Sequence, residues 1–451
     1  MEKKTDMRAV ALDTLIDMDR NQKLSHIAIG DALMRCQFES KQDRAFLTHL
    51  CEGVIERKIY LDYMLDSVSK TPMRKCKPLI RNLLRMSAYQ ILFMQVPDAA
   101  ACNEAAGLAK KRGFRNLTGF VNGVLRNLSR QKEQLNLPDP KKSRTQYLSV
   151  RYSMPVWIVE LLDKQYGKEL SETILDAFMK VRPVTIRTNL SKITPENLKK
   201  RLEEEKVSVE QAPYLPYAFT IHDFNYLGRI PSFREGLFAV QDVSSMLAVS
   251  VADIKEGDFI LDLCAAPGGK TFHAADRLGM NGKIISRDLT EYKTDFIKEN
   301  QERMDYNQVK VEVWDATELD SNLIGQADLV IADLPCSGLG IMGRKNDIKY
   351  HMNQEQLLDL VDLQRRILTN AWQYVKAGGQ MIYSTCTLNQ GENIENVRWI
   401  EENTPLRLVS IEEKLPEELR GRSGKEGYIQ LVPGQDSCDG FFFAKFENKG
   451  N

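Results

Sequence analysis

Hydrophobic residues recur at helical spacing through the first 130 residues of the chain. Val10, Leu12, Leu15 and Ile16 follow this spacing, and the same pattern returns later in this region. No alternating strand pattern interrupts these segments. A polar connector that contains two prolines follows at residues 131–144. We therefore expect an all-α domain over residues 1–140.

The hydrophobic pattern of the next hundred residues is mixed. Residues 183–189 alternate as a strand should, and Thr194 stands before Pro195 as the cap of a helix that runs to about residue 205. We expect a small α+β module over residues 145–235. The module has no chemistry that can be identified from its sequence.

From residue 236 onward, strand patterns and helix patterns alternate. Apolar runs predict five strands, at residues 259–264, 283–288, 309–315, 327–333 and 379–387. Alternating β and α elements predict a doubly wound parallel sheet, with ligands bound beyond the carboxyl ends of its strands. We expect a Rossmann-like α/β domain over residues 236–451, with strand order 3-2-1-4-5.

Charge is distributed unevenly between these regions. The 451 residues contain 62 Lys and Arg and 62 Asp and Glu, but residues 1–150 contain 26 basic against 16 acidic side chains. A local surplus of positive charge suits an anionic partner such as nucleic acid. A solvated helical surface is the plainer explanation of the same surplus.

Several classes of protein do not fit the composition. The chain has no run of about 18 uncharged apolar residues, and its start lacks the apolar segment of a signal peptide. We expect a cytoplasmic protein without a membrane span. The eight cysteines show no close zinc-site spacing, so neither structural metal nor disulfides are expected.

An acidic residue lies near the carboxyl end of four of the five expected strands. These residues are Asp262, Asp288, Asp315 and Asp333. Their charge would repel the pyrophosphate of a dinucleotide, and the first turn lacks the G-x-G-x-x-G spacing that binds it. S-adenosylmethionine, a cation without phosphate, fits better. A single such Asp is more often a turn former or helix cap, but four in register favour a site.

The turn after the first of these strands contains small residues that let a ligand approach the backbone. Ala265, Ala266, Gly268 and Gly269 form this turn, and Lys270 follows them. Asp288 lies 19 residues beyond Gly269, where an acid commonly binds ribose hydroxyls. Lys270 is either a solvated lysine in a first helical turn or a group directed at a substrate.

Two cysteines follow neighbouring strands of the expected sheet. Cys336 comes just after the fourth strand and Cys386 lies at the end of the fifth, so both thiols should face one crevice. Most cysteines are small buried hydrophobic residues. Beside a methyl-donor pocket, however, a thiolate could add to carbon 6 of a pyrimidine and make carbon 5 nucleophilic. The second thiol could then assist release, and Asp333 could bind the base.

Three motifs resemble those of the Sun/RsmB family of RNA cytosine carbon-5 methyltransferases. They are LDLCAAPGGKT at residues 261–271, DLPCSG at 333–338 and STCT at 384–387. QDVSS at residues 241–245 and DGFFFA at 439–444 are also similar, and the second would be a closing antiparallel strand. No catalytic position departs from the family pattern, although Arg287 is a basic residue where the strand favours an apolar one.

The resemblance implies roles for individual residues. Cys386 would be the nucleophile and Cys336 the thiol that promotes product release, with Asp333 and Lys270 near the target base. The implied contacts to S-adenosylmethionine are Cys264, Ala265, Ala266, Pro267, Gly268, Gly269, Lys270, Asp288, Asp315 and Asp333.

The resemblance also covers the rest of the chain. Residues 43–47 and 121–126 are similar to the NusB-type RNA-binding domain, and residues 187–189 match the R-x-N element of the family's middle module. This arrangement implies small-subunit (16S) ribosomal RNA as the substrate and partner of a monomer that needs no metal or membrane. The remaining alternatives are a tRNA methyltransferase, a non-catalytic RNA-binding assembly protein and a redox sensor that uses both cysteines.

Overall fold

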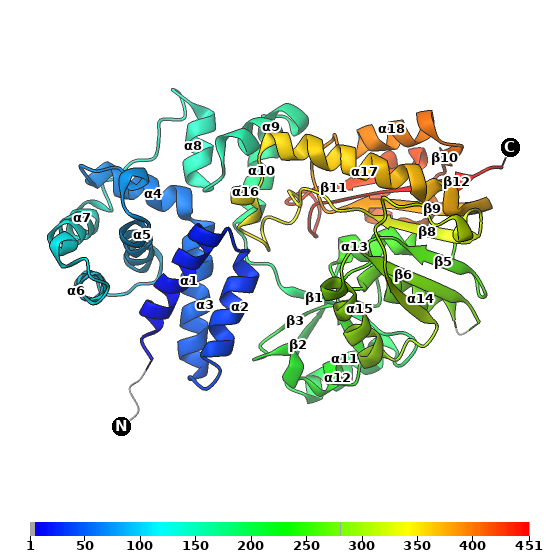
Figure 1. The fold of residues 1–451 in the computed structure, drawn as a ribbon, viewed down its shortest axis with the longest axis horizontal. Coiled ribbons are helices and arrows are strands. Elements are labelled where there is room, and N and C mark those ends of the chain that lie inside the picture. The colour runs from blue at the N-terminus through cyan, green and yellow to red at the C-terminus, as the bar shows by residue number, and fades with distance from the viewer. Residues whose placement is uncertain (1–4, 280, 451) are drawn as a thin grey trace. The chain divides into compact units, whose positions relative to one another are not determined.

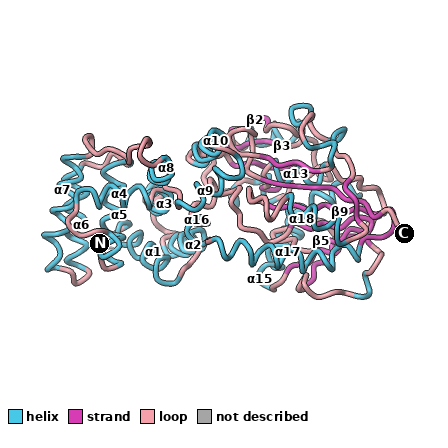
Figure 2. Tube along the Cα trace, turned by 90° about the horizontal axis from the view of Figure 1, so that it is seen from above, coloured by secondary structure: helices cyan, strands magenta, loops and turns pink. Residues whose placement is uncertain are grey.

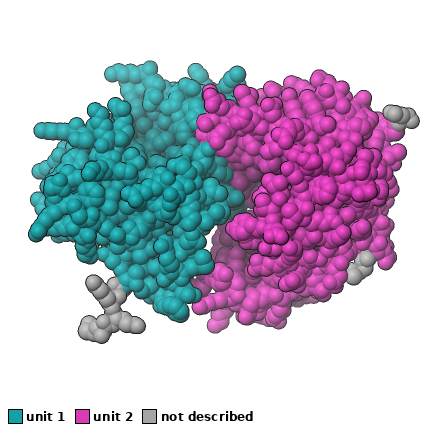
Figure 3. Space-filling model, in the orientation of Figure 1, with its two compact units in different colours: residues 1–179, 344–351 teal, residues 180–343, 352–451 magenta. Residues whose placement is uncertain are grey.

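The computed structural model describes residues 5–279 and 281–450. The first four residues, part of the chain start that lacks an apolar run, lie outside the described ones. The chain forms two compact units (Figure 3). The helical unit is Met1–Met179 with Arg344–His351, and the catalytic unit is Lys180–Gly343 with Met352–Asn451.

The first seven helices of the helical unit form one core (Figure 1). They are α1 (Met7–Asn21), α2 (Ser25–Arg35), α3 (Lys41–Glu56), α4 (Lys58–Val68), α5 (Pro78–Phe93), α6 (Asp98–Lys111) and α7 (Thr118–Gln131). Helix α5 is buried most deeply and packs against α1, α3, α4, α6 and α7. No strand occurs among residues 5–179, which confirms the all-α prediction for the front of the chain.

Four further helices belong to the helical unit. Beyond the proline-containing connector lie α8 (Arg144–Arg151), α9 (Val156–Tyr166) and α10 (Lys168–Phe178). The fourth is the short α16 (Ile348–His351), which comes from residues far later in the chain. Figure 2 shows that the strands gather in the catalytic unit. No helix among the described residues is long and apolar enough to cross a membrane.

A small antiparallel sheet confirms the predicted α+β module. Its strands are β1 (Val184–Thr188), β2 (Ser208–Gln211), β3 (Ala218–His222) and β4 (Phe238–Val240), in the order β2-β3-β1-β4. Helix α11 (Pro195–Glu204) connects β1 to β2, and the Thr194 side chain caps it by accepting the Asn197 N–H. The short α12 (Pro231–Arg234) precedes β4.

The large sheet has the predicted doubly wound topology. Its strands are β5 (Phe259–Asp262), β6 (Lys283–Asp288), β7 (Val309–Val313), β8 (Ala327–Asp333), β9 (Val375–Thr385), β10 (Leu406–Leu408), β11 (Tyr428–Leu431) and β12 (Phe441–Asn448). The order is β10-β12-β9-β8-β5-β6-β7, with β11 also paired to β12. The five central strands are parallel and follow the predicted 3-2-1-4-5 order. Strand β12 runs antiparallel to β9, which confirms the closing strand.

Helices cover both faces of this sheet (Figure 1). Helices α13 (Val243–Ser250), α14 (Gly269–Leu278) and α15 (Glu291–Met304) pack on one face, and α17 (Gln354–Tyr374) and α18 (Ile394–Asn403) on the other. Neighbouring strand residues alternate between the two cores: Ile260 belongs to the first and Leu261 to the second. Both layers leave the carboxyl ends of the parallel strands free for a site.

Strands β5, β7 and β9 end two residues earlier than predicted. Cys264, Asp315 and Cys386 therefore lie in the turns that follow these strands. Turn residues are not held in the hydrogen-bond ladder of the sheet, so their side chains can be directed beyond its edge.

Candidate functional site

The turn between β5 and α14 requires glycine at one position. Gly268 has φ of 100°, and a Cβ atom there would lie 2.2 Å from the Phe272 ring. The turn brings the N-terminus of α14 to the carboxyl edge of the sheet. A cavity opens at this edge, which we call the edge cavity. Among the predicted site residues, it is lined by Asp262, Cys264, Ala265, Ala266, Pro267, Gly269, Lys270, Asp333 and Cys386.

Asp262 is a fully buried carboxyl group in the wall of the edge cavity. Its Oδ2 accepts a 2.6 Å hydrogen bond from the Thr271 hydroxyl, whereas its Oδ1 is buried without a partner. Burial raises the pKa of Asp262 to about 7. A buried oxygen without a partner fits a cavity that receives a hydrogen-bond donor or a cation.

Two other predicted acidic residues do not line the edge cavity. Asp288 shapes its turn instead, because it accepts the Ala266 N–H at 3.0 Å and also pairs with Lys293. Asp315 accepts the N–H and the hydroxyl of Thr317, and these hydrogen bonds lower its pKa. Gly268 is likewise absent from the lining.

Lys270, which is buried, and Asp333, which is partly exposed, form an ion pair in the lining of the edge cavity. Lys270 Nζ lies 2.7 Å from Asp333 Oδ2, and the Ser384 hydroxyl donates to Asp333 Oδ1 at 2.6 Å. The ammonium group also lies over the Phe441 ring, 4.8 Å from its centroid. Lys270 is therefore held inside the site and is not a solvated lysine of a first helical turn.

The sulfur atoms of the two predicted cysteines lie 3.3 Å apart. Cys336 follows β8 and Cys386 follows β9, and these two strands are parallel neighbours. The Cys386 N–H also donates to the Cys336 sulfur at 3.3 Å. The strand order therefore brings the two thiols together as expected, although only Cys386 lines the edge cavity and Cys336 does not.

The environment of the pair favours a proton on Cys336. Its pKa is raised by the hydrogen bond with Cys386 first, then by burial and by the negative charge of Glu392. Either sulfur of the pair can donate the hydrogen bond that joins them. Cys264, the third cysteine at this edge, has a pKa raised by burial and stays a thiol in the wall.

Sequence reasoning missed a buried polar cluster behind the cysteines. It contains Ser337, Gln364, Thr387, Asn389 and Glu392. The signal was a run of polar residues directly after the fifth strand, but its partners lie up to 55 residues away. No group of side chains suited to a metal ion occurs among residues 5–279 and 281–450.

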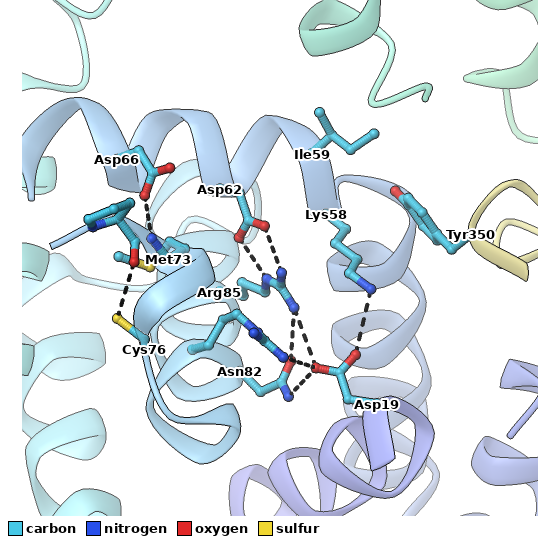
Figure 4. Close-up of polar contacts among 12 residues, drawn as sticks. Asp19, Lys58, Ile59, Asp62, Asp66, Met73, Cys76, Asn82, Arg85 and Tyr350 are labelled. Carbon is cyan, nitrogen blue, oxygen red and sulfur yellow. Dashed lines mark hydrogen bonds and ion pairs between the residues drawn. The ribbon is translucent and has the colours of Figure 1, made fainter. Parts of the chain in front are cut away.

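The helical unit carries both a basic surface and a buried charge network. On α7, Val121, Val124 and Leu128 are buried while Arg126 and Arg130 are exposed. Figure 4 shows the buried network around Arg85. Its guanidinium makes two hydrogen bonds to the Asp62 carboxylate, at 2.7 and 2.6 Å.

Asp19 is the second acid of this network (Figure 4). Its carboxylate contacts the cationic side chains of Arg81, Arg85 and Lys58 at 3.3, 3.6 and 3.5 Å and accepts from Asn82 at 2.8 Å. Burial opposes ionisation of Asp19, but these partners together lower its pKa.

Comparison with protein families assigns each region of the chain. Residues 249–447 match the 16S rRNA methyltransferase RsmB/F family, and residues 5–130 match the NusB family. Residues 154–225 match the ferredoxin-like domain of RsmF/B-like methyltransferases.

Individual relatives are similar over the full chain. The probable ribosomal RNA small subunit methyltransferase B of Bacillus subtilis is 34% identical, covering 99% of this chain and 100% of the relative. The corresponding Synechocystis protein is 30% identical, covering 98% and 99%. The crystal structure of PH0851 has 25% identity and a TM-score of 0.81, covering 99% of this chain and 100% of that chain. Because this likeness spans all regions, the chain belongs to the Sun/RsmB family of small-subunit ribosomal RNA methyltransferases.

Proposed function

We propose that the protein transfers a methyl group from S-adenosylmethionine to carbon 5 of a cytosine in 16S ribosomal RNA, in the cytoplasm. One observation carries the proposal: Cys386 lines a cavity whose wall contains a buried carboxyl oxygen without a partner, and its sulfur lies 3.3 Å from the sulfur of Cys336. The family of the chain supports the substrate class.

The edge cavity fits the proposed methyl donor. S-adenosylmethionine would supply an electrophilic methyl group on a cationic sulfur. The Asp262 carboxyl could accept a hydrogen bond from this ligand, and the small side chains of residues 265–269 leave room for it beside the backbone. Gly268, Asp288 and Asp315 complete the proposed cofactor set, although they do not line the cavity among the described residues.

Cys386 is the proposed nucleophile. Its thiolate adds to carbon 6 of the cytosine, and the electron pair of the ring bond makes carbon 5 reactive towards the methyl donor. Asp333 and Lys270 are proposed to contact the base, with the Asp333 carboxyl near ring nitrogen 3. Their ion pair fixes both side chains before RNA arrives.

Cys336 is proposed to act in product release. After methylation, carbon 5 must lose its proton and the bond between carbon 6 and the Cys386 sulfur must break, which regenerates the thiolate. The Cys336 thiol is close enough to donate a hydrogen bond to the leaving sulfur.

Labelled methyl donor and unmodified 16S RNA test the nucleophile. We expect Cys386→Ala to lose at least about a thousandfold in rate, because the covalent activator is absent. Cys76→Ala, in the helical unit, is the control and should transfer normally. Methyl transfer that persists in Cys386→Ala would overturn the assignment.

The proposed release step predicts a trapped adduct. In Cys336→Ala, elimination is slowed, so a protein–RNA adduct should survive denaturation and be visible as a shifted band on a gel. The absence of that band would argue against a release function. The double variant with Cys386→Ala should form no adduct.

The same assay separates the remaining alternatives. Transfer to unmodified tRNA but not to 16S RNA would redirect the substrate, and bisulfite sequencing of a strain without the protein would identify the position. A non-catalytic assembly protein should show no saturable heat with the methyl donor in calorimetry.

A further inference from the structure

Glu392 is a buried carboxylate behind the proposed catalytic pair, in the segment between β9 and α18. It accepts four hydrogen bonds. Ser337 donates its N–H at 2.9 Å and its hydroxyl at 2.5 Å, and Gln364 and Asn389 donate at 3.0 and 3.1 Å. Four donors and no acceptor around one carboxyl group indicate its ionised form.

This carboxylate holds the loop that carries Cys336 from both sides. The Ser337 N–H, directly after the cysteine, donates to Glu392. The Gln364 amide donates to the Pro335 carbonyl, directly before the cysteine, at 2.9 Å and also to Glu392. The two residues that flank Cys336 are therefore anchored to the same group.

The loop that carries Cys386 is joined to the same cluster. The hydroxyl of Thr387, directly after Cys386, shares a 2.7 Å hydrogen bond with the Ser337 hydroxyl. Asn389, two residues further on, donates to Glu392. The two loops come from neighbouring strands, and these side chains tie both cysteine-bearing segments to a common buried carboxylate.

The negative charge of Glu392 also acts on the chemistry of the pair. It is one of the groups that raise the pKa of Cys336, after Cys386 and burial. It therefore favours the protonated form of the Cys336 thiol.

We propose that Glu392 is a positioning residue for the two cysteines: its carboxylate sets the separation of their sulfur atoms by anchoring both loops that carry them. The effect on catalysis rests on the proposed function. The effect on the sulfur separation does not, because it concerns only the folded protein.

The first experiment measures this separation without RNA or methyl donor. The full chain is oxidised with diamide, which accepts two electrons as Cys336 and Cys386 form a disulfide, and the linked peptides are followed by mass spectrometry. In Glu392→Gln an amide NH2 group replaces one carboxylate oxygen and faces side chains that also donate hydrogen bonds, so some of the contacts that anchor the loops are lost. We therefore expect this variant to form the disulfide about tenfold or more slowly than the wild type. Glu395→Gln is the matched control, since Glu395 is exposed on the next helix.

The second experiment measures methyl transfer. In Glu392→Gln, kcat should fall about tenfold to a hundredfold, the rate equivalent of a lost hydrogen bond to a charged group, with KM for the methyl donor unchanged. The covalent RNA adduct should accumulate as in Cys336→Ala. Ser337→Ala, which removes the hydroxyl between Glu392 and Thr387, should give a smaller effect in the same direction. This variant replaces Glu392→Gln in both experiments if Glu392→Gln folds poorly.

The outcomes are distinguishable. If Glu392→Gln and Ser337→Ala both form the disulfide as fast as Glu395→Gln, the positioning proposal is overturned whatever their activity. A lower melting temperature of both variants together with an unchanged rate of disulfide formation would also overturn it. Slow disulfide formation combined with normal transfer by Cys386→Ala would uphold the positioning of the loops and reject the proposed cysteine chemistry.

Discussion

Two sets of buried acidic groups, one in the helical unit and one in the catalytic unit, differ in their partners. In the helical unit, Asp19 and Asp62 each have cationic partners within the same set of helices. In the catalytic unit, Asp262 is more deeply buried, but one of its oxygens has no partner. Both carboxylates of the first arrangement have cationic partners, and we call this network complete; Asp262 has no partner for one oxygen, and we call its site incomplete.

This difference separates structural charges from charges available to a ligand. Burying an ionised group without partners costs several kcal/mol, so a fold retains an incomplete site only where another constraint maintains it. The raised pKa of Asp262 shows that the protein meets this cost partly by protonation. The paired acids of the helical unit need no such relief, since the pKa of Asp19 is lowered.

Removing the cation of the complete network should have the largest effect on stability. Arg85→Ala removes both hydrogen bonds to Asp62 and one of the three cations around Asp19, and we expect a loss of about 3 kcal/mol in the free energy of unfolding. Urea denaturation followed by circular dichroism measures this loss. Arg126→Ala, on an exposed face of α7, is the control and should change stability by about 0.5 kcal/mol or less. Similar values for both variants would contradict the structural importance of the network.

Removing the charge of the incomplete site should affect ligand binding. Asp262 ionises as the pH rises through about 7, so affinity for the cationic methyl donor should increase about tenfold between pH 6 and 8. Asp262→Asn should remove this dependence and bind as weakly at pH 8 as at pH 6. Calorimetry across this pH range measures it, with the exposed Asp305→Asn as the control. A pH-dependent affinity in Asp262→Asn would assign the titration to another group.

Lys349 is a buried cationic side chain of the helical unit that, like Asp262, lacks an oppositely charged side chain within hydrogen-bond distance. It therefore tests whether an unpartnered buried charge alters the pH dependence of stability. Lys349 is 3% exposed, and its Nζ donates to the Glu56 carbonyl at 3.0 Å. Burial lowers its pKa to about 7. Between this value and the ordinary value of 10.5, the unfolded chain binds a proton that the folded chain does not.

Stability should therefore rise with pH through this group above pH 7. Lys349→Met should reduce the slope of unfolding free energy between pH 8 and 10 by up to about 1.4 kcal/mol per pH unit. Lys345→Met, exposed in the same segment, should leave the slope unchanged. An unchanged slope in Lys349→Met would contradict the assignment of this titration.

The smallest expected effect concerns exposed charge on the helical unit. Replacing Arg126 and Arg130 with Gln should weaken binding of 16S RNA a few-fold and lower the salt dependence of log K by about one for each lost phosphate contact. Filter binding at several salt concentrations measures both. An unchanged salt slope would place the RNA surface elsewhere.

Local sequence patterns were sufficient to predict the architecture. Strand order, the Thr194 cap and the meeting of Cys336 with Cys386 follow from hydrophobic periodicity and the geometry of parallel sheets. These features depend on residues close together in the chain or on the rules that govern connections between parallel strands.

Features that depend on distant partners could not be predicted. Arg287 stood out as a basic residue in a strand, but its partners Glu312 and Asp320 are 25 and 33 residues away. The Glu392 cluster has the same property, because Ser337 is 55 residues away in the sequence. The sequence marked Arg287 as unusual, whereas the burial and the pairing of these polar groups required the fold.

The excursion of residues 344–351 into the helical unit has a consequence for protein engineering. The chain leaves the catalytic unit after Gly343, contributes Lys349 and Tyr350 to the helical unit, and returns at Met352. A deletion of residues 1–179 would remove the partners of these two side chains. Both side chains lie only a short stretch of sequence after the loop that carries Cys336. A chimera that exchanges the helical unit between relatives must therefore transplant two separate pieces of the gene.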